Sequence, residues 1–356
     1  MNRSVGPKFS GRRFQHLFAS AADVDSGPEL EEARGHAFSE ARATAGNEDA
    51  LALEKVFGEH RVGLDFEKDD YMALGRCLCI AGLSLLLVST QPGVPAEAGS
   101  AWQILAPGME IRRVQSRNQS ALGDSKITVL RIDPSIWELE IAGVFQAGEA
   151  AGRTAREWAQ KQKYAAAINA GMFLTDNKTH LGYMRSRDQV LNGKINRYQS
   201  VLAFDPRDGK KIPQVRIFDL DSTESSMQSV LADYKSAVQN LRLIKRPGVN
   251  QWGKQTREWS EAAVGEDSDG HLLFIYSRSP FSMHDLNEEL LAAGIGVVAA
   301  QHMEGGPEAQ LYVRAGSTEL EMFGSYETSF KENDENSAAW PVPNVIGVRA
   351  RSATAR

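Results

Sequence analysis

Cysteine is scarce in this chain, because its 356 residues include only Cys77 and Cys79. Both lie inside one apolar run, so the sequence offers no disulfide framework and no Cys/His spacing typical of a zinc site. A large excess of one charge is also missing, since 40 Lys and Arg stand against 46 Asp and Glu. Without a broad basic surface, the sequence predicts no nucleic-acid partner.

Several common functional motifs are absent or incomplete. No G-x-S-x-G sequence marks the nucleophile elbow of a serine hydrolase. The stretch "GIGVVA" at 294–299 matches a dinucleotide loop, but it precedes a predicted strand, whereas the motif requires a strand before it. The stretches "DPRDGK" and "EDSDGH" lack the spacing of a calcium loop, so we interpret them as turns. No cofactor or metal ligand is therefore predicted, although the sequence leaves a divalent metal open.

The longest apolar run, residues 72–98, has the parts of a secretory signal. Arg76 provides a short basic start, an apolar stretch follows to about Val88, and "AEA" at 96–98 forms a small-residue cleavage site. The apolar stretch itself, from about Cys77 to Val88, is shorter than the roughly 20 residues that cross a bilayer. We therefore predict a secreted or periplasmic protein whose mature chain begins near Gly99. An uncleaved signal-anchor, which would be its only membrane contact, and a buried core helix remain alternatives.

Residues 1–71 form a polar, acidic extension with nine Lys and Arg against fourteen Asp and Glu. Signal peptides belong at the true N-terminus of a chain. We therefore interpret this extension as disordered or as the product of a start assigned upstream of Met72. A cytoplasmic tail before a signal-anchor is the alternative.

Residues 99–352 predict one α+β domain with a central mixed or antiparallel sheet flanked by helices. Helical spacing marks 154–162 and 222–241, and Ser282 and Gly294 bracket a third helix. Alternating strands predict hairpins at 125–145, at 199–221 and at 257–277, and a buried strand at 295–304.

Two polar residues follow apolar strands and precede glycine. Asn169 follows "AAAI" and comes just before Gly171, and Glu304 precedes Gly305 and Gly306. Glycine leaves room for ligand atoms to approach the backbone, and a partly desolvated carboxylate suits proton transfer. We expect both strands centrally in one sheet. The alternative is that Asn169 bonds nearby backbone and Glu304 pairs with an arginine.

The segments "AAINAGMF", "GEDSDGHLLFIYS", "HMEGGPEAQLYV" and "VPNVIGVRA" together resemble the phosphodiester glycosidase domain family, in its motif order, over roughly residues 100–350. The resemblance implies hydrolysis of a sugar–phosphate diester, with bacterial relatives exported and often linked to exopolysaccharide. The family pattern Asn-Leu-Asp-Gly-Gly is replaced here by "HMEGG" at 302–306, which moves the carboxylate about one methylene further out.

The chemistry that the resemblance implies requires a carboxylate near the anomeric carbon, a second acid or base and cations for the phosphate. We assign the acid/base or nucleophile role to Glu304 and rank His302 below it as a proton donor. The remaining candidates are Asp176 as second carboxylate, with Asn169, Gly171, Gly305, Gly306, Arg185 and Arg257 as substrate-binding residues.

A non-catalytic glycan-binding or envelope-structural module is the competing class. Its sugar platforms would be Phe173, Tyr183 or Trp252, although core packing explains each of these side chains equally well. A general phosphatase or nuclease is not favoured, because it would show a dense Asp/His metal cluster.

Overall fold

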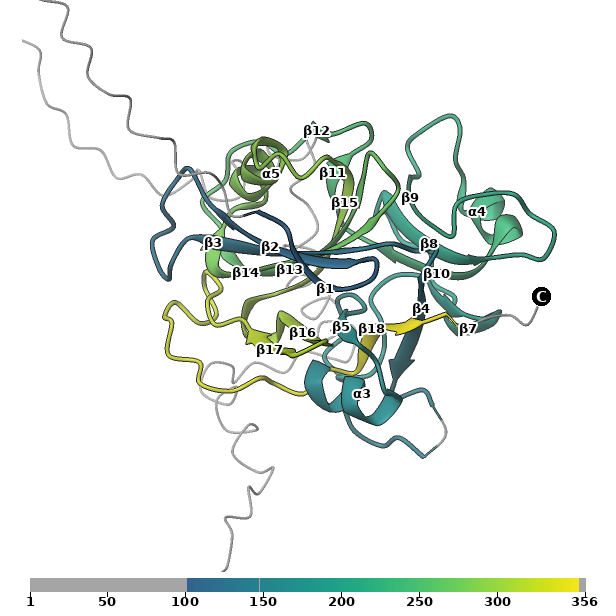
Figure 1. Ribbon diagram of the computed structural model, residues 1–356, viewed down its shortest axis with the longest axis horizontal. Helices are drawn as coiled ribbons and strands as arrows, with labels where there is room; N and C mark the ends of the chain where they lie inside the picture. The colour runs from purple at the N-terminus through teal and green to yellow at the C-terminus, as the bar shows by residue number, and fades with distance from the viewer. Residues whose placement is uncertain (1–100, 147, 352–356) are drawn as a thin grey trace, which may run out of the picture. The chain divides into compact units, whose positions relative to one another are not determined.

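Three β-sheets and three α-helices make up the part of the chain that the structure, a computed structural model, describes: residues 101–146 and 148–351 (Figure 1). The predictions for residues 1–98 lie outside this part. Every strand pairing is antiparallel. The predicted α+β class is correct only in outline, because strand predominates and three sheets replace the single central one. None of the helices described is long and apolar enough to span a bilayer.

The largest sheet has eight strands and contains the Glu304 segment. In spatial order its strands are β1 (Gln103–Ala106), β2 (Met109–Gln115), β3 (Lys126–Ile132), β14 (Leu272–Phe281), β13 (Trp259–Asp267), β15 (Val297–Gly305), β11 (Arg242–Lys245) and β12 (Val249–Asn250). The β13–β14 hairpin and the buried strand β15 confirm the sequence predictions.

The second sheet has five strands and contains the Asn169 segment at its centre. Its order is β17 (Thr318–Phe323), β16 (Gln310–Ala315), β5 (Ala166–Asn169), β18 (Asn344–Ala350) and β4 (Trp137–Gly143). The expectation that Asn169 and Glu304 end strands of one sheet is therefore wrong. The predicted hairpin at 125–145 is wrong as well, because β3 pairs with β2 and β14 whereas β4 pairs with β18.

The third sheet also has five strands. Its order is β7 (Gln189–Asn192), β6 (Met184–Ser186), β10 (Tyr234–Asn240), β8 (Ser200–Pro206) and β9 (Val215–Asp219). The predicted pairing around "DPRDGK" is confirmed by β8 and β9. The predicted helix at 222–241 is only half correct, because α4 (Met227–Asp233) ends where β10 begins. Pairing of β10 with β8 and β6 overrides the helical spacing of its sequence.

All three sheets contribute apolar side chains to one shared core. The outer face of each sheet packs against one helix, visible in Figure 1 as α5, α3 and α4 near their sheets. In α3 (Ala155–Gln162), Thr154 and Glu157 form a capping box; in α5 (Met283–Ala292), the Ser282 hydroxyl accepts a hydrogen bond from the Asp285 amide. Both caps confirm the predicted helix starts. A 3-10 turn, η1 (Gly306–Glu308), carries the chain from β15 toward β16.

Candidate functional site

Glu304 lies near the end of β15 and is 2 % exposed. The β13–β15 register pairs Ala262 with Glu304 but Ala263 with His302, so Met303 is an extra residue in the ladder. Such a β-bulge changes the direction of the side chains around it. Residues that pair across a ladder share a face and successive residues alternate, so Glu304 and His302 lie on opposite faces of the sheet.

His302 is half of a buried acid–imidazole pair. Its Nδ1 lies 2.6 Å from Oε1 of Glu261, and the two residues are 3 % and 1 % exposed. The other carboxylate oxygen of Glu261 accepts a hydrogen bond of 2.7 Å from the indole nitrogen of Trp259. The Trp259 and His302 rings also meet edge to face, with centroids 6.2 Å apart. This arrangement fixes the orientation of the imidazole from two sides.

The two glycines after Glu304 make room for protein side chains. A β-carbon on Gly305 would lie 2.8 Å from Cδ1 of Trp259, and one on Gly306 would lie 2.6 Å from Oε2 of Glu327. Gly306 also has a φ of +65°, which favours glycine. The Gly-Gly sequence therefore brings the Trp259 indole and the Glu327 carboxylate against the backbone that follows Glu304. The space attributed to a ligand is occupied by these two side chains.

Asn169 connects the two glycine-flanked segments. Its Nδ2 donates to the Glu308 carbonyl at 2.9 Å, and its Oδ1 accepts from the Gln310 amide at 2.7 Å. Although β5 and β15 belong to different sheets, Asn169 thus binds the backbone only four to six residues beyond Glu304. The side chain is 2 % exposed and holds that backbone in place. A contact with a sugar hydroxyl or a phosphate stays a prediction.

The space beside Gly171 is filled in the same way. A β-carbon there would lie 2.9 Å from Nδ1 of His180 and 2.8 Å from Nδ2 of Asn240. Asn240 in turn donates to the Met303 carbonyl of β15 at 3.5 Å. Burial lowers the pKa of His180 to about 4, although its hydrogen bond to the Gln239 carbonyl acts in the opposite direction. A neutral imidazole thus joins the Gly171 loop to β10, and the Asn240 amide of β10 reaches β15.

The other predicted residues lie apart from this junction or have structural partners. Asp176 is exposed, and its carboxylate accepts hydrogen bonds from Lys178 and Thr179 within its own loop. Those bonds lower its pKa in spite of the opposing effect of partial burial. The Arg185 guanidinium is buried and donates to carbonyls at the end of α4 and the start of β10. Arg257 is half-buried, two residues before β13.

The three aromatic residues considered as sugar platforms have core positions. Tyr183 and Trp252 are buried in the cores behind α4 and α5, and Phe173 packs against the core behind α3. The Trp252 indole nitrogen also donates to the Arg242 carbonyl at 2.9 Å. Core packing, the alternative reading of these side chains, accounts for all three.

The structure adds Glu261 and Glu327 to the candidates. Glu261 had a signal in the sequence, because a single carboxylate interrupts the small apolar strand "AAVG" and its neighbours. A polar residue in a buried strand points to a specific partner. No sequence signal marked Glu327. It lies beside Gly306 because of an isolated β-bridge between Trp259 and Glu327, which are far apart in the sequence.

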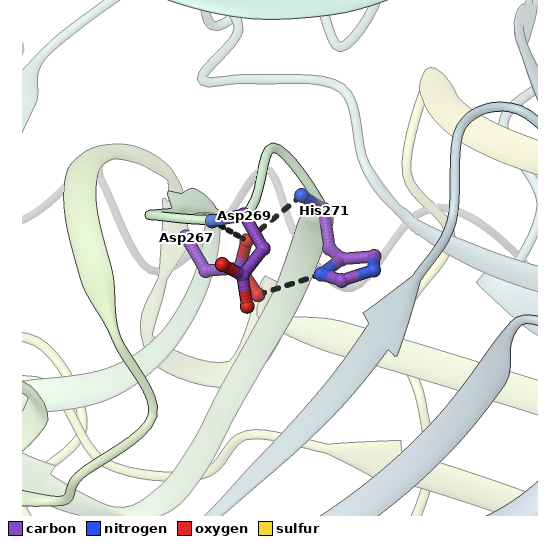
Figure 2. Close-up of side chains that lie close together, drawn as sticks. All are labelled: Asp267, Asp269 and His271. Carbon is purple, nitrogen blue, oxygen red and sulfur yellow. Dashed lines mark hydrogen bonds and ion pairs between the residues drawn. The ribbon is translucent and has the colours of Figure 1, made fainter.

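A separate group of possible metal ligands lies at the tip of the β13–β14 hairpin. Figure 2 shows Asp267, Asp269 and His271, whose ligand atoms lie within 4.8 Å of one another. Oδ1 of Asp267 accepts from the amides of Asp269 and His271, and its Oδ2 lies 3.0 Å from the His271 ring nitrogen. These bonds close an Asp-Gly turn, as the sequence indicated, and the turn accounts for the group without an ion.

The domain is rich in β-strand, and one glycine-flanked strand end carries buried carboxylates and an oriented imidazole. Such groups are typical of hydrolase active sites, so these features make the protein a candidate hydrolase. The sequence model of one family, the phosphodiester glycosidases, matches residues 162–349. The match covers more than half of the chain, so this protein belongs to the phosphodiester glycosidase family.

Two solved structures resemble this chain at low sequence identity. The catalytic domain of zebrafish N-acetylglucosamine-1-phosphodiester alpha-N-acetylglucosaminidase, auto-inhibited by its pro-peptide, has 14 % identity and a TM-score of 0.49 over 69 % of this chain and 85 % of that one. A hypothetical protein from Synechocystis has 15 % identity and a TM-score of 0.46 over 69 % of this chain and 62 % of its own. Among proteins of curated function, none matches this chain in sequence.

Proposed function

We propose that this protein is an exported hydrolase that cleaves the glycosidic bond of a sugar–phosphate diester and acts on an exopolysaccharide or envelope glycan. Membership of the phosphodiester glycosidase family supports the reaction class. The observation that carries the proposal is the meeting of carboxylates at one strand end. Glu304 and His302 lie in β15, Glu261 on the facing strand β13 binds His302, and Glu327 lies against Gly306.

Glycoside hydrolysis needs one carboxylate to attack or to activate water and a second group to move a proton. We assign the first role to Glu304. Glu327 replaces Asp176 as the second carboxylate, because it lies against the backbone next to Glu304 whereas Asp176 is bonded within its own exposed loop. His302 is bound by Glu261 on the opposite face of β15, so we assign this pair a positioning role at the strand end that carries Glu304.

The catalytic assignment is tested with paired variants on a synthetic sugar-1-phosphate diester. We expect Glu304→Gln to remove turnover and to leave the circular dichroism spectrum unchanged, because the side chain keeps its size. Glu327→Gln should lower kcat by at least about 100-fold, which is typical of a lost acid–base group. Full activity of Glu304→Gln would reject the assignment. Sugar binding without turnover in the wild type would favour a glycan-binding module.

Export is tested separately, since it depends on residues 72–98. We expect N-terminal sequencing of the protein recovered outside the cytoplasm to give a start near Gly99. A mature start upstream of Met72 would contradict the proposed signal peptide and favour the signal-anchor.

A further inference from the structure

A second site lies on the same face of the eight-stranded sheet as Glu304. It is a groove of about 500 Å³ between β2, β3 and β14 on one side and β17 on the other. Thr128 and Tyr276 are its buried residues, whereas Phe323 is half-buried. The groove thus combines hydroxyl groups from the sheet with an aromatic side chain from a neighbouring sheet, which is a common composition of a small-ligand site.

The strand register connects this groove to Glu304. Arg113 pairs with Thr128, Thr128 with Tyr276, Tyr276 with Ala262, and Ala262 with Glu304. Residues that pair across successive strands share one face, so these five side chains form a single row. Adjacent strands are about 4.8 Å apart, which places the backbones of Tyr276 and Glu304 about 10 Å apart. Between them in the row lies Ala262, which is buried in the shared core, so packed side chains separate the groove from Glu304.

The charges around the groove cancel. Three basic side chains (Arg113, Lys126 and Arg278) and three acidic ones (Asp124, Glu321 and Asp334) line it. Several of these have ion-pair partners, such as Arg278 with Asp334 at 2.8 Å and Glu321 with Arg156 at 2.9 Å. A site for a phosphate group would show an excess of basic side chains. Alternating donors and acceptors without net charge suit a neutral polyhydroxylated ligand.

One buried hydroxyl in the groove lacks a well-aligned partner. Among the residues that the structure describes, none forms a well-aligned hydrogen bond with the Tyr276 hydroxyl, and the Arg278 guanidinium is the charged group beside it. Leaving such a group unpaired costs folding free energy, so a buried hydroxyl normally has a water or ligand partner. Burial raises the pKa of Tyr276, so the hydroxyl stays protonated and can both donate and accept. Phe323, with the Arg278 guanidinium 5.4 Å from its ring centroid, forms a wall beside it.

We propose that this groove binds a neutral sugar unit of the substrate, at a distance from the bond that is cleaved. The inference rests on the proposed function, because the groove shares its face with Glu304. It implies that the substrate is an extended glycan, since a single small ligand in the groove would not reach Glu304. The Tyr276 hydroxyl would bond a sugar hydroxyl, and Phe323 would contact the C–H face of the sugar ring.

The test measures binding without turnover, by NMR of the full chain with labelled tyrosine rings and threonine methyls. Cellobiose, maltose and lactose serve as phosphate-free probes. We expect at least one disaccharide to shift the signals of Tyr276 and Thr128. We expect Tyr276→Phe to weaken that binding about two- to tenfold, as the loss of one hydrogen bond does. Its melting temperature should not fall, because the hydroxyl has no well-aligned partner among the described residues.

Tyr312→Phe is the matched control. The Tyr312 hydroxyl donates to Glu319 at 2.9 Å and lines a different groove, so this variant should lose stability and bind the sugar as the wild type does. Three outcomes would overturn the inference: no shift with any of the three sugars, equal binding by Tyr276→Phe, or the same shifts with inorganic phosphate. Because binding is read without hydrolysis, sugar binding together with an active Glu304→Gln would reject the catalytic assignment and leave the groove standing.

Discussion

The buried pair of Glu261 and His302 contributes to stability and also fixes which nitrogen of the imidazole carries the proton. Replacing Glu261 by alanine or by glutamine separates these two effects. Alanine leaves the Trp259 indole N–H and Nδ1 of His302 without their shared acceptor. Glutamine has the same shape, so its oxygen can still accept from Trp259 while its amide donates to Nδ1. In that case the imidazole proton must move to Nε2. The first change removes hydrogen bonds, and the second reverses the direction of one.

The expected stability losses follow from burial, since both partners are almost completely inaccessible. Removing one member of a buried pair costs about 3–5 kcal/mol. We therefore expect Glu261→Ala to lower the free energy of unfolding by about 4 kcal/mol. A loss of 1 kcal/mol lowers the melting temperature of a domain of this size by about 2–4 °C, so the midpoint should fall by roughly 10 °C. For Glu261→Gln we expect a loss of only about 1 kcal/mol.

Urea denaturation of the purified variants gives these free energies, and turnover of the sugar-1-phosphate diester gives the effect on kcat. We expect Glu261→Gln to stay folded and to lower kcat, because the reversed hydrogen bond to His302 disturbs the strand end that carries Glu304. Asp208→Ala is the control, since its exposed ion pair with Lys235 should contribute less than about 1 kcal/mol. A Glu261→Ala protein within 1 kcal/mol of the wild type would refute the reasoning about the pair.

Three further predictions concern the residues around the site. The low pKa of His180, about 4 against an ordinary 6.5, means that the unfolded chain takes up a proton before the folded one does. The free energy of unfolding should therefore fall by up to about 3 kcal/mol as the pH drops from about 6.5 to about 4. Thermal melts should show a flatter pH dependence for His180→Gln, and an unchanged one would contradict the assignment. Asn169→Ala should cost about 2–4 kcal/mol in urea, because two buried backbone groups lose their partner; a loss below 1 kcal/mol would show that water replaces the amide. Gly306→Ala should lower the melting temperature more than Gly270→Ala, since both have positive φ but only Gly306 has a neighbour, Glu327, in the β-carbon position. Equal shifts would remove the packing argument.

Local parts of the fold were predictable because their causes lie within a few residues. The caps at Thr154 and Ser282 and the hairpin around "EDSDG" depend on side chains next to the backbone that they bond. The strand pairing around "DPRDGK" is of the same kind. In each case the sequence contains both the signal and its partner.

Long-range parts of the fold were not predictable from spacing. Residues 126–132 and 137–143 look like a hairpin, yet they enter different sheets. The first segment pairs with β2 before it and with β14 more than a hundred residues later, whereas the second pairs with β18. The segment after Asp233 has helical spacing, but in the fold it lies between β6 and β8 and pairs with both of them. The alternation of apolar and polar residues in one segment does not indicate which distant strands it will pair with.

A close approach beside the glycines of the candidate site was predictable from the sequence, but the group that makes the approach was not. The glycines at 171, 305 and 306 correctly indicated where the chain allows a close approach. Their sequence could not tell whether ligand or protein would fill the space, and in the structure His180, Trp259 and Glu327 fill it. Those side chains come from loops or strands that are distant in the sequence, so the residues around each glycine do not predict them.

The central position of β5 has a consequence for how the protein is made. β5 pairs only with β16 and β18, which emerge from the ribosome after more than 140 further residues have been synthesised. Until residue 350 has left the exit tunnel, the strand that carries Asn169 lacks its pairing with β18. Asn169 also cannot bond the backbone beyond Glu304 until residue 310 has been synthesised. Folding with such high contact order is slow and exposes nascent strands to aggregation. Deleting the last strand, β18, should therefore abolish production of soluble protein far more severely than its seven residues would suggest.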